Sequence, residues 1–244
     1  MLWQILFGTI LLTASALLYV LHFAIFRNAH HIFIYLLGDL AFIPIEVLLV
    51  TIILHQLLES REKRIRMEKL NMIIGVFFNE LGTELVTYFS DLDPNLDEIK
   101  KHLVIKDYWT DKEYDQVVKQ LKSHKYQVQV GKVDMNGLKI YLSDKKDILL
   151  RILENPNLME HEEFTDLLQA VFHLSSELVS RKECSSLLDK DCAHLELDIA
   201  RAYRLLVIQW INYMRHLKRN YPFLFSLAMR TNPFDSTASP FIQA

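Results

Sequence analysis

Two long runs of apolar residues open the chain. The first, Leu2–Phe26, contains no charged residue, and the second, Ile32–Leu58, follows after residues 27–31. A helix rises about 1.5 Å per residue, so each run is long enough to cross the roughly 30 Å hydrocarbon core of a bilayer. Because the connection is so short, the two helices must run in opposite directions. The pattern predicts a transmembrane hairpin over residues 1–58.

A cleaved signal peptide is the competing interpretation of the first run, because residues 13–16 offer the small side chains of a cleavage site. No Lys or Arg precedes the run, however, and apolar sequence continues well beyond that site to Phe26. A signal peptide normally begins with positive charge and ends at its cleavage site. The sequence therefore favours an uncleaved membrane anchor.

The distribution of positive charge favours one orientation of this hairpin. Five Lys and Arg residues lie within residues 61–69, whereas Arg27 is the single one between the two apolar runs. Under the positive-inside rule, the amino terminus and the rest of the chain are both expected in the cytoplasm. The sequence thus predicts a multi-pass protein of the cell membrane.

Two acidic residues, Asp39 and Glu46, interrupt the second apolar run on either side of Pro44. They are seven residues apart and therefore lie on nearly the same helix face, while the proline predicts a kink. A carboxylate in hydrocarbon costs at least a few kcal/mol. Such residues are therefore expected to face a protein interior, a partner or water.

Two interpretations of these acids stay open. In one, they line a path for cations or protons through an oligomer. In the other, polar groups at matching depth on the first helix satisfy them, with Thr13 or Ser15 opposite Glu46 and Tyr19 or His22 nearer Asp39. A two-helix hairpin has little surface with which to hide two acids from lipid. Both interpretations therefore favour a homo-oligomer.

The rest of the chain follows helical periods. Apolar positions three and four apart recur over residues 70–88 and predict that the second helix continues to about Ser90, before Pro94 stops it. Further amphipathic helices are expected over 93–104, 111–124, 132–154, 158–181 and 189–220.

These patterns predict an all-α protein that consists of the hairpin, a cytoplasmic helical bundle over residues 59–231 and a flexible tail over 232–244. Of the chain's 27 Lys and Arg and 30 Asp and Glu residues, all but Arg27, Asp39 and Glu46 lie in the bundle or the tail. Their near balance leaves no basic stripe, which argues against a nucleic-acid partner.

Other common signatures of chemistry are missing from the sequence. The two cysteines, Cys184 and Cys192, match no zinc motif and favour reduced thiols. The sequence also has no glycine-rich phosphate loop, nucleophile elbow or cofactor motif. We therefore expect a protein that is not an enzyme.

One constellation of candidate metal ligands lies in the last two long helices. His173 and Glu177 are four residues apart, as are His194 and Asp198, so each pair can share one helix face. If the two faces met, their imidazole and carboxylate groups would suit iron, manganese or zinc. Three further candidates lie nearby in the sequence: Asp191, Glu196 and His216.

The alternative to a metal site is a structural network in which the same side chains pair with a nearby arginine. The candidates are Arg181, Arg201 and Arg204. Buried polar groups are normally satisfied in this way, and the Glu-x-x-His pattern of di-iron bundles is absent. Both interpretations remain open at this point.

Three segments resemble a family of uncharacterised bacterial and archaeal membrane proteins. They are LGDLAFIP at residues 37–44, ENPNLMEHE at 154–162 and NYPFLF at 220–225. The resemblance runs over most of the chain. It implies a prokaryotic cytoplasmic membrane, and it implies no activity.

The sequence leads to three functional hypotheses. The first is a non-enzymatic, homo-oligomeric protein whose helical domain senses, regulates or scaffolds at the membrane, with the bilayer and an unidentified cytosolic protein as partners. The second is a cation or proton channel lined by Asp39 and Glu46. The third is a membrane-tethered metalloprotein that uses the two histidines and two carboxylates of the last long helices.

Overall fold

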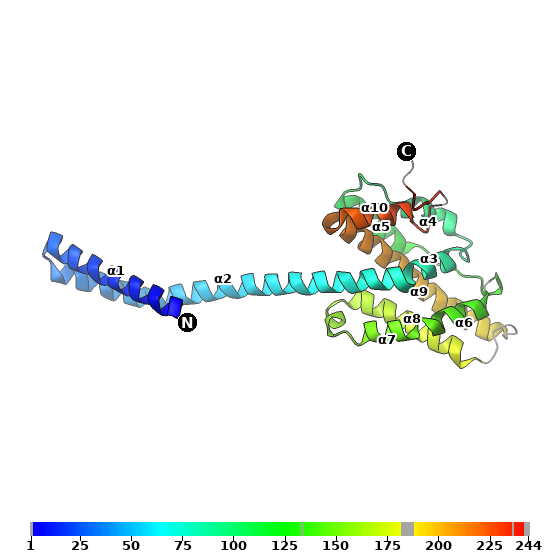
Figure 1. The fold of residues 1–244 in the computed structure, drawn as a ribbon, viewed down its shortest axis with the longest axis horizontal. Coiled ribbons are helices and arrows are strands. Elements are labelled where there is room, and N and C mark those ends of the chain that lie inside the picture. Colours follow the sequence, from blue (N-terminus) through cyan, green and yellow to red (C-terminus); the bar gives the residue numbers. More distant parts are fainter. Residues whose placement is uncertain (1, 133, 182–187, 236, 242–244) are drawn as a thin grey trace. The chain divides into compact units, whose positions relative to one another are not determined.

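The protein is helical throughout the part of the chain that can be described. The computed structural model covers residues 2–132, 134–181, 188–235 and 237–241. All regular elements within these ranges are helices, and no strand occurs there. The chain divides into two compact units, Met1–Arg64 and Ile65–Ala244 (Figure 1). The all-α fold class predicted from the sequence is confirmed.

The first unit consists of α1 (Leu2–Phe26) and the first part of α2 (Ala29–Phe77). Between them Arg27 adopts a left-handed conformation with a φ of 47°. The Asn28 side chain then accepts a hydrogen bond from the backbone N–H of His31 over 3.1 Å. A left-handed residue ends a helix and an asparagine cap starts one, so the chain reverses within two residues.

Both helices of this unit are long and apolar enough to cross a membrane by length and composition. Neither apolar stretch is buried by the described residues. Exposed apolar surface costs about 25 cal/mol per Å² in water, so these stretches require a cover from outside the chain. α2 continues through Pro44 and past Leu58, the expected end of the second apolar helix.

The second unit is a helical bundle. After α2 it contains α3 (Thr83–Ser90), α4 (Leu96–Leu103), α5 (Asp111–Ser123), α6 (Met135–Asp144), α7 (Lys146–Leu153), α8 (Glu162–Ser180), α9 (Asp189–Asn220) and α10 (Pro222–Arg230). Two 3-10 turns precede α6 and α8, namely η2 (Val130–Lys132) and η3 (Pro156–Glu160). The long helix α9 contacts α3, α5, α8 and α10 and forms the centre of the bundle (Figure 1).

A π-helical turn, η1 (Phe78–Gly82), joins α2 to α3. Thr83 marks it, because its backbone N–H and its hydroxyl both donate to the carbonyl of Phe78, five residues earlier. A π turn holds one residue more than an α turn. At this turn, the neighbours Phe77 and Phe78 both lie in the core, where they are 0 % and 1 % exposed.

Aromatic contacts tie this turn to α8 and α9. The Phe78 ring stacks on Tyr213 with centroids 5.2 Å apart and meets Trp210 edge-on at 5.5 Å. Phe77 meets Phe164 edge-on, also at 5.5 Å. Such pairs add about 0.5–1.5 kcal/mol each beyond the burial of their surface. The apolar stripe at the end of α2 thus packs in the bundle core.

Two differences from the predicted helices have a clear local cause. The helix expected over 132–154 is divided at Lys145, whose φ of −87° and ψ of 1° are not helical. The division lets α6 and α7 each pack against α8. No helix was predicted at α10, because proline interrupts a helix interior. Pro222 instead occupies the start of α10, a position that proline suits.

The segment after α10 begins in the core. Asn232 and Phe234 are each 2 % exposed, and the Asn232 side-chain amide donates to the backbone carbonyl of Leu103 over 2.9 Å. The side-chain Oδ1 of Asn232 in turn accepts from the backbone N–H of Phe234. These residues belong to the segment expected as a flexible tail over 232–244. Its first residues are instead buried, and Asn232 is hydrogen-bonded to the end of α4.

Candidate functional site

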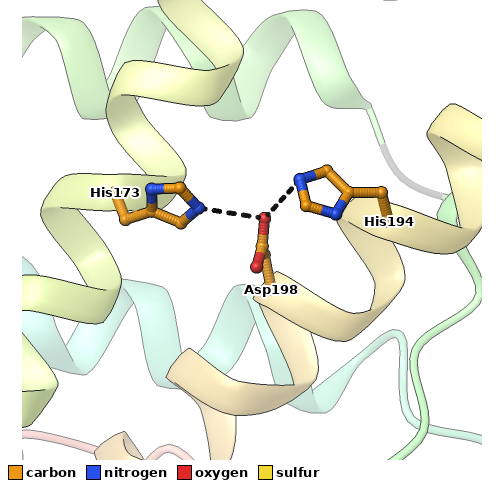
Figure 2. Close-up of side chains that lie close together, drawn as sticks. All are labelled: His173, His194 and Asp198. Atoms are coloured by element: carbon orange, nitrogen blue, oxygen red, sulfur yellow. Dashed lines mark ion pairs between the residues drawn. The ribbon is translucent and has the colours of Figure 1, made fainter.

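α8 and α9 pack along each other and bring together residues from both predicted ligand pairs (Figure 2). His173 belongs to α8, whereas His194 and Asp198 lie one turn apart in the first part of α9. The ligand atoms of these three residues lie within 4.8 Å of one another. The two helix faces identified from spacing therefore meet.

The Asp198 carboxylate lies between the two imidazole rings. Its Oδ2 is 3.5 Å from Nε2 of His173 and 3.3 Å from Nε2 of His194. This buried oxygen nevertheless has no hydrogen-bond donor among the described residues. Ligand atoms about 2.1 Å from a tetrahedral ion lie roughly 3.4 Å from one another. The two separations suit ligands that share one ion, and they also lie within the range of ion pairs between the carboxylate and the two imidazoles.

The cluster is open to solvent on the side of the imidazoles. The side chains of His173 and His194 are 52 % and 50 % exposed, whereas that of Asp198 is 16 % exposed. Two imidazoles and a carboxylate suit Zn²⁺, Mn²⁺ or Fe²⁺. An ion bound there would exchange with the surrounding solution without unfolding the bundle.

Glu177, the fourth predicted ligand, lies at the edge of the cluster and is held by Arg181. Its Oε2 accepts a hydrogen bond from Nη1 of Arg181 over 2.6 Å and lies 3.9 Å from Nε2 of His194. This hydrogen bond lowers the pKa of the Glu177 carboxyl, and the imidazoles of His173 and His194 act in the same direction. Arg181 also pairs with Asp191 at 3.4 Å. A structural ion pair and a candidate metal site therefore lie side by side.

The other candidates from the sequence lie away from the cluster. Glu196 is two residues from His194, about 200° around the helix, and its Oε1 accepts a hydrogen bond from the backbone N–H of Val130 over 3.1 Å. His216 lies about six turns, or about 33 Å, further along α9, where its ring contacts the Asn220 side chain. Neither residue joins the cluster.

The candidate intramembrane residues do not bond to one another in the described structure. Asp39 and Glu46 are both exposed on α2. On α1, the Thr13 hydroxyl donates to a backbone carbonyl of its own helix over 2.6 Å. His22 contacts the ring of His31, with centroids 5.7 Å apart. The pairing expected between Thr13 and Glu46, and between His22 and Asp39, is therefore not formed within one chain.

A buried polar group that the sequence did not indicate lies near the end of α3. The Asp93 side chain is fully buried, and its Oδ2 is 3.7 Å from Nε2 of His124. Burial raises the pKa of the Asp93 carboxyl. The hydrogen bond from the Asn95 backbone N–H and the charge of His124 act in the opposite direction but are outweighed. Burial also raises the pKa of Tyr126 and Tyr203, whose hydroxyls have no hydrogen-bond partner among the described residues. Only the fold brings these groups together.

Among the described residues, the candidate ligands are nitrogen and oxygen atoms. Cys192 is half-buried in the first turn of α9 and is not one of them. Cys184, the other cysteine, lies outside the described residues.

Comparison with known proteins identifies the family. Residues 66–230 match the family model described as "Uncharacterized protein MJ1433, C-terminal helical domain", and residues 2–58 match "MJ1433, N-terminal helical domain". A relative from Methanocaldococcus jannaschii, described as "Uncharacterized protein MJ1433", is 46 % identical over 234 residues, which cover 96 % of this chain and 94 % of the relative. No solved structure shows a significant match. The resemblance to an uncharacterised prokaryotic family is confirmed, and the chain belongs to the MJ1433 family of helical proteins.

Proposed function

We propose that this protein is a membrane-anchored sensor or regulator whose helical bundle binds a transition metal ion. α1 and the apolar part of α2 would span the cytoplasmic membrane, with the amino terminus and the bundle in the cytoplasm. The length, apolar composition and exposure of these two helices support the membrane spans. The five basic residues within 61–69 support the orientation.

One observation carries the metal site. Oδ2 of Asp198 lies 3.3 Å and 3.5 Å from two imidazole nitrogens and has no hydrogen-bond donor among the described residues. A buried acceptor without a partner costs about 1–3 kcal/mol, and a bound cation removes that cost. The half-exposed imidazoles favour reversible binding, as a sensor requires. We assign no reaction to the site, because the sequence carries no motif of one.

We also propose that the protein is a homo-oligomer in the membrane. Asp39 and Glu46 are exposed on α2, and no described group of α1 bonds to them. A carboxylate that faces lipid costs at least a few kcal/mol. A second copy of the hairpin would cover both acids. The metal state of the bundle would then be read by a cytosolic protein partner.

Metal content tests the proposed function. Full-length protein purified in detergent and exposed to Zn²⁺, Mn²⁺ or Fe²⁺ should retain about one ion per chain, measured by inductively coupled plasma mass spectrometry. The double variant His173→Ala with His194→Ala should retain none, because two of the three ligands are gone. His102→Ala, which removes a histidine of α4, is the matched control. Wild-type protein that retains none of the three ions would contradict the proposal.

A second candidate function, conduction of cations or protons, is favoured by the same exposed acids. Rings of acidic side chains attract cations in channels, and Asp39 and Glu46 would form two such rings in an oligomer. Reconstituted wild-type protein should then pass cations, and Glu46→Gln should lower the flux while the oligomer stays intact. Glu59→Gln, which changes an acid beyond the apolar run, is the control. Silent wild-type protein across a range of voltage and pH would exclude this function.

A further inference from the structure

The short helix α10 is apolar on two sides. On its inner side Phe225 is buried in the bundle. On its outer side Phe223, Leu224 and Leu227 lie within about 100° of one another, and all three are exposed, Phe223 by 92 %. A helix on the surface of a soluble protein normally carries polar residues on its outer side. The outer face of α10, formed by these three residues, therefore calls for a cover that the described residues do not supply.

An exposed tyrosine lies at the same corner of the bundle. The Lys218 ammonium, near the end of α9, lies 5.8 Å from the centre of the Phe225 ring. It also donates to the backbone carbonyl of Trp109 over 2.8 Å and to that of Asp107, the two residues that flank the exposed Tyr108. Tyrosine is enriched where a bilayer meets water, and exposed apolar surface marks contacts with membranes or with other proteins. The composition of this corner is thus that of a membrane contact.

The chain keeps the start of α10 within reach of the apolar part of α2. Burial lowers the pKa of the His216 imidazole, and the charge of Glu68 on α2 acts in the opposite direction, so these two residues are neighbours. The His216 ring contacts the Tyr221 ring at the start of α10, with centroids 5.6 Å apart. Glu68 follows Leu58 by ten residues, which extend over no more than about 36 Å in any conformation. A bilayer that α2 crosses is therefore tethered to α10 at a high effective concentration.

The charges near this corner suit anionic headgroups. Two acids of α5 that face the end of α9 are paired with arginines, Asp111 with Arg215 and Arg219, and Asp115 with Arg215. The Arg219 side chain is nevertheless well exposed. Five basic residues within 61–69 also follow the second apolar run, and such clusters next to a membrane span attract anionic lipids. Charge thus favours a lipid surface as the cover of α10.

We infer that the outer face of α10 inserts among the headgroups of the bilayer in which α1 and α2 are anchored. The apolar outer face, the short tether and the basic residues together favour lipid over another protein surface. An interfacial helix of this kind buries its apolar side and leaves its ends in water. The inference rests on the membrane spans of the proposed function. It adds a docked position of the bundle at the membrane surface, which the tether alone does not fix.

Quenching of tryptophan fluorescence by brominated lipid tests this contact, because bromine quenches only tryptophans close to it. Full-length protein with Trp3→Phe is reconstituted into vesicles of phosphatidylcholine and phosphatidylglycerol brominated near the headgroups, and Phe223→Trp adds the probe. The emission of the new tryptophan should fall by about half or more relative to unbrominated vesicles, since an interfacial helix buries its apolar face about 5–10 Å deep. Leu197→Trp is the matched control. Leu197 is 72 % exposed but lies about 28 Å back along α9 from His216, so its emission should not change.

The tryptophan in α1 separates failure of this inference from failure of the proposed function. Wild-type protein compared with Trp3→Phe reports the emission of Trp3, which should be quenched if α1 lies in the bilayer. Unquenched Trp3 would contradict the membrane anchor itself. Quenched Trp3 with unquenched Phe223→Trp would overturn only the docking of α10. Leu227→Trp, one turn further along the same face, repeats the measurement should Phe223→Trp fail to fold. An unquenched, blue-shifted emission that is lost when the protein is diluted in lipid would assign the face to a second copy and also overturn the inference.

Discussion

Asp198→Asn is expected to abolish most of the stabilisation that a metal ion gives the helical bundle. An ion present at 100 times its dissociation constant stabilises the folded protein by about 2.7 kcal/mol. For a domain of this size, that raises the melting temperature by about 5–10 °C. The neutral amide introduced by this substitution is a poor replacement for the central carboxylate, so the variant should show little of this shift.

The metal-free protein gives the second half of this prediction. Without a metal, Oδ2 of Asp198 has no hydrogen-bond donor among the described residues. In chelator, Asp198→Asn should therefore change the free energy of unfolding by less than about 1 kcal/mol. Calorimetric melting of both proteins with chelator and with Zn²⁺ measures both effects. Asp166→Asn, at an exposed position of α8, is the control. A large loss of stability in chelator would instead identify Asp198 as part of a structural polar network.

Gly82→Ala is expected to destabilise the bundle by about 1–3 kcal/mol through overpacking. The backbone of Gly82 is helical, with φ −65° and ψ −40°, so helix propensity alone would favour alanine by up to about 1 kcal/mol. The added Cβ would lie 2.6 Å from Cε1 of Phe77 and 2.7 Å from Cδ1 of Phe78. Both rings are fully packed in the core, so steric overlap should outweigh propensity.

Chemical unfolding in urea measures this effect as a lower transition midpoint with an unchanged slope. Gly131→Ala is the matched control, because no atom lies within 4 Å of the position that its Cβ would occupy. If Gly82→Ala proved more stable than the wild type, the two phenylalanine rings would have room to move aside, and the tight packing described for the π turn would be incorrect.

Apolar spacing predicted the long helices well, because their periods repeat over many turns. The helix α9 spans the predicted residues 189–220, and α8 ends within one residue of the expected position. The π turn could not be predicted, since spacings of three and four fit a continuous α-helix equally well. The backbone hydrogen bond from Thr83 to the carbonyl of Phe78, five residues earlier, reveals the extra residue. The spacing of apolar residues thus predicts the positions of helices, but it does not predict where an α-helix changes to a π turn.

The candidate site was predictable in composition but not in arrangement. Spacing of four residues determined which ligands share a helix face, whereas the packing of α8 on α9 determined that His173 approaches Asp198. In the same region, Glu177 forms an ion pair with Arg181. No ion pair among the described residues links Arg201 or Arg204 to the cluster. For Asp39 and Glu46, which are exposed on α2, a partner from a second copy is part of the proposed homo-oligomer and cannot be derived from the pattern of one chain.

The π turn also limits the chain lengths that this family can adopt. Each residue advances an α-helix by about 100°, and the buried stripe that includes Leu70 and Ile74 is followed by η1, which holds one residue beyond an α turn. Removing a residue between Phe78 and Gly82 would rotate that stripe by about 100° relative to α3 and carry it out of the core. We therefore expect relatives to keep the number of residues in this turn, as well as the glycine at position 82 that its packing requires.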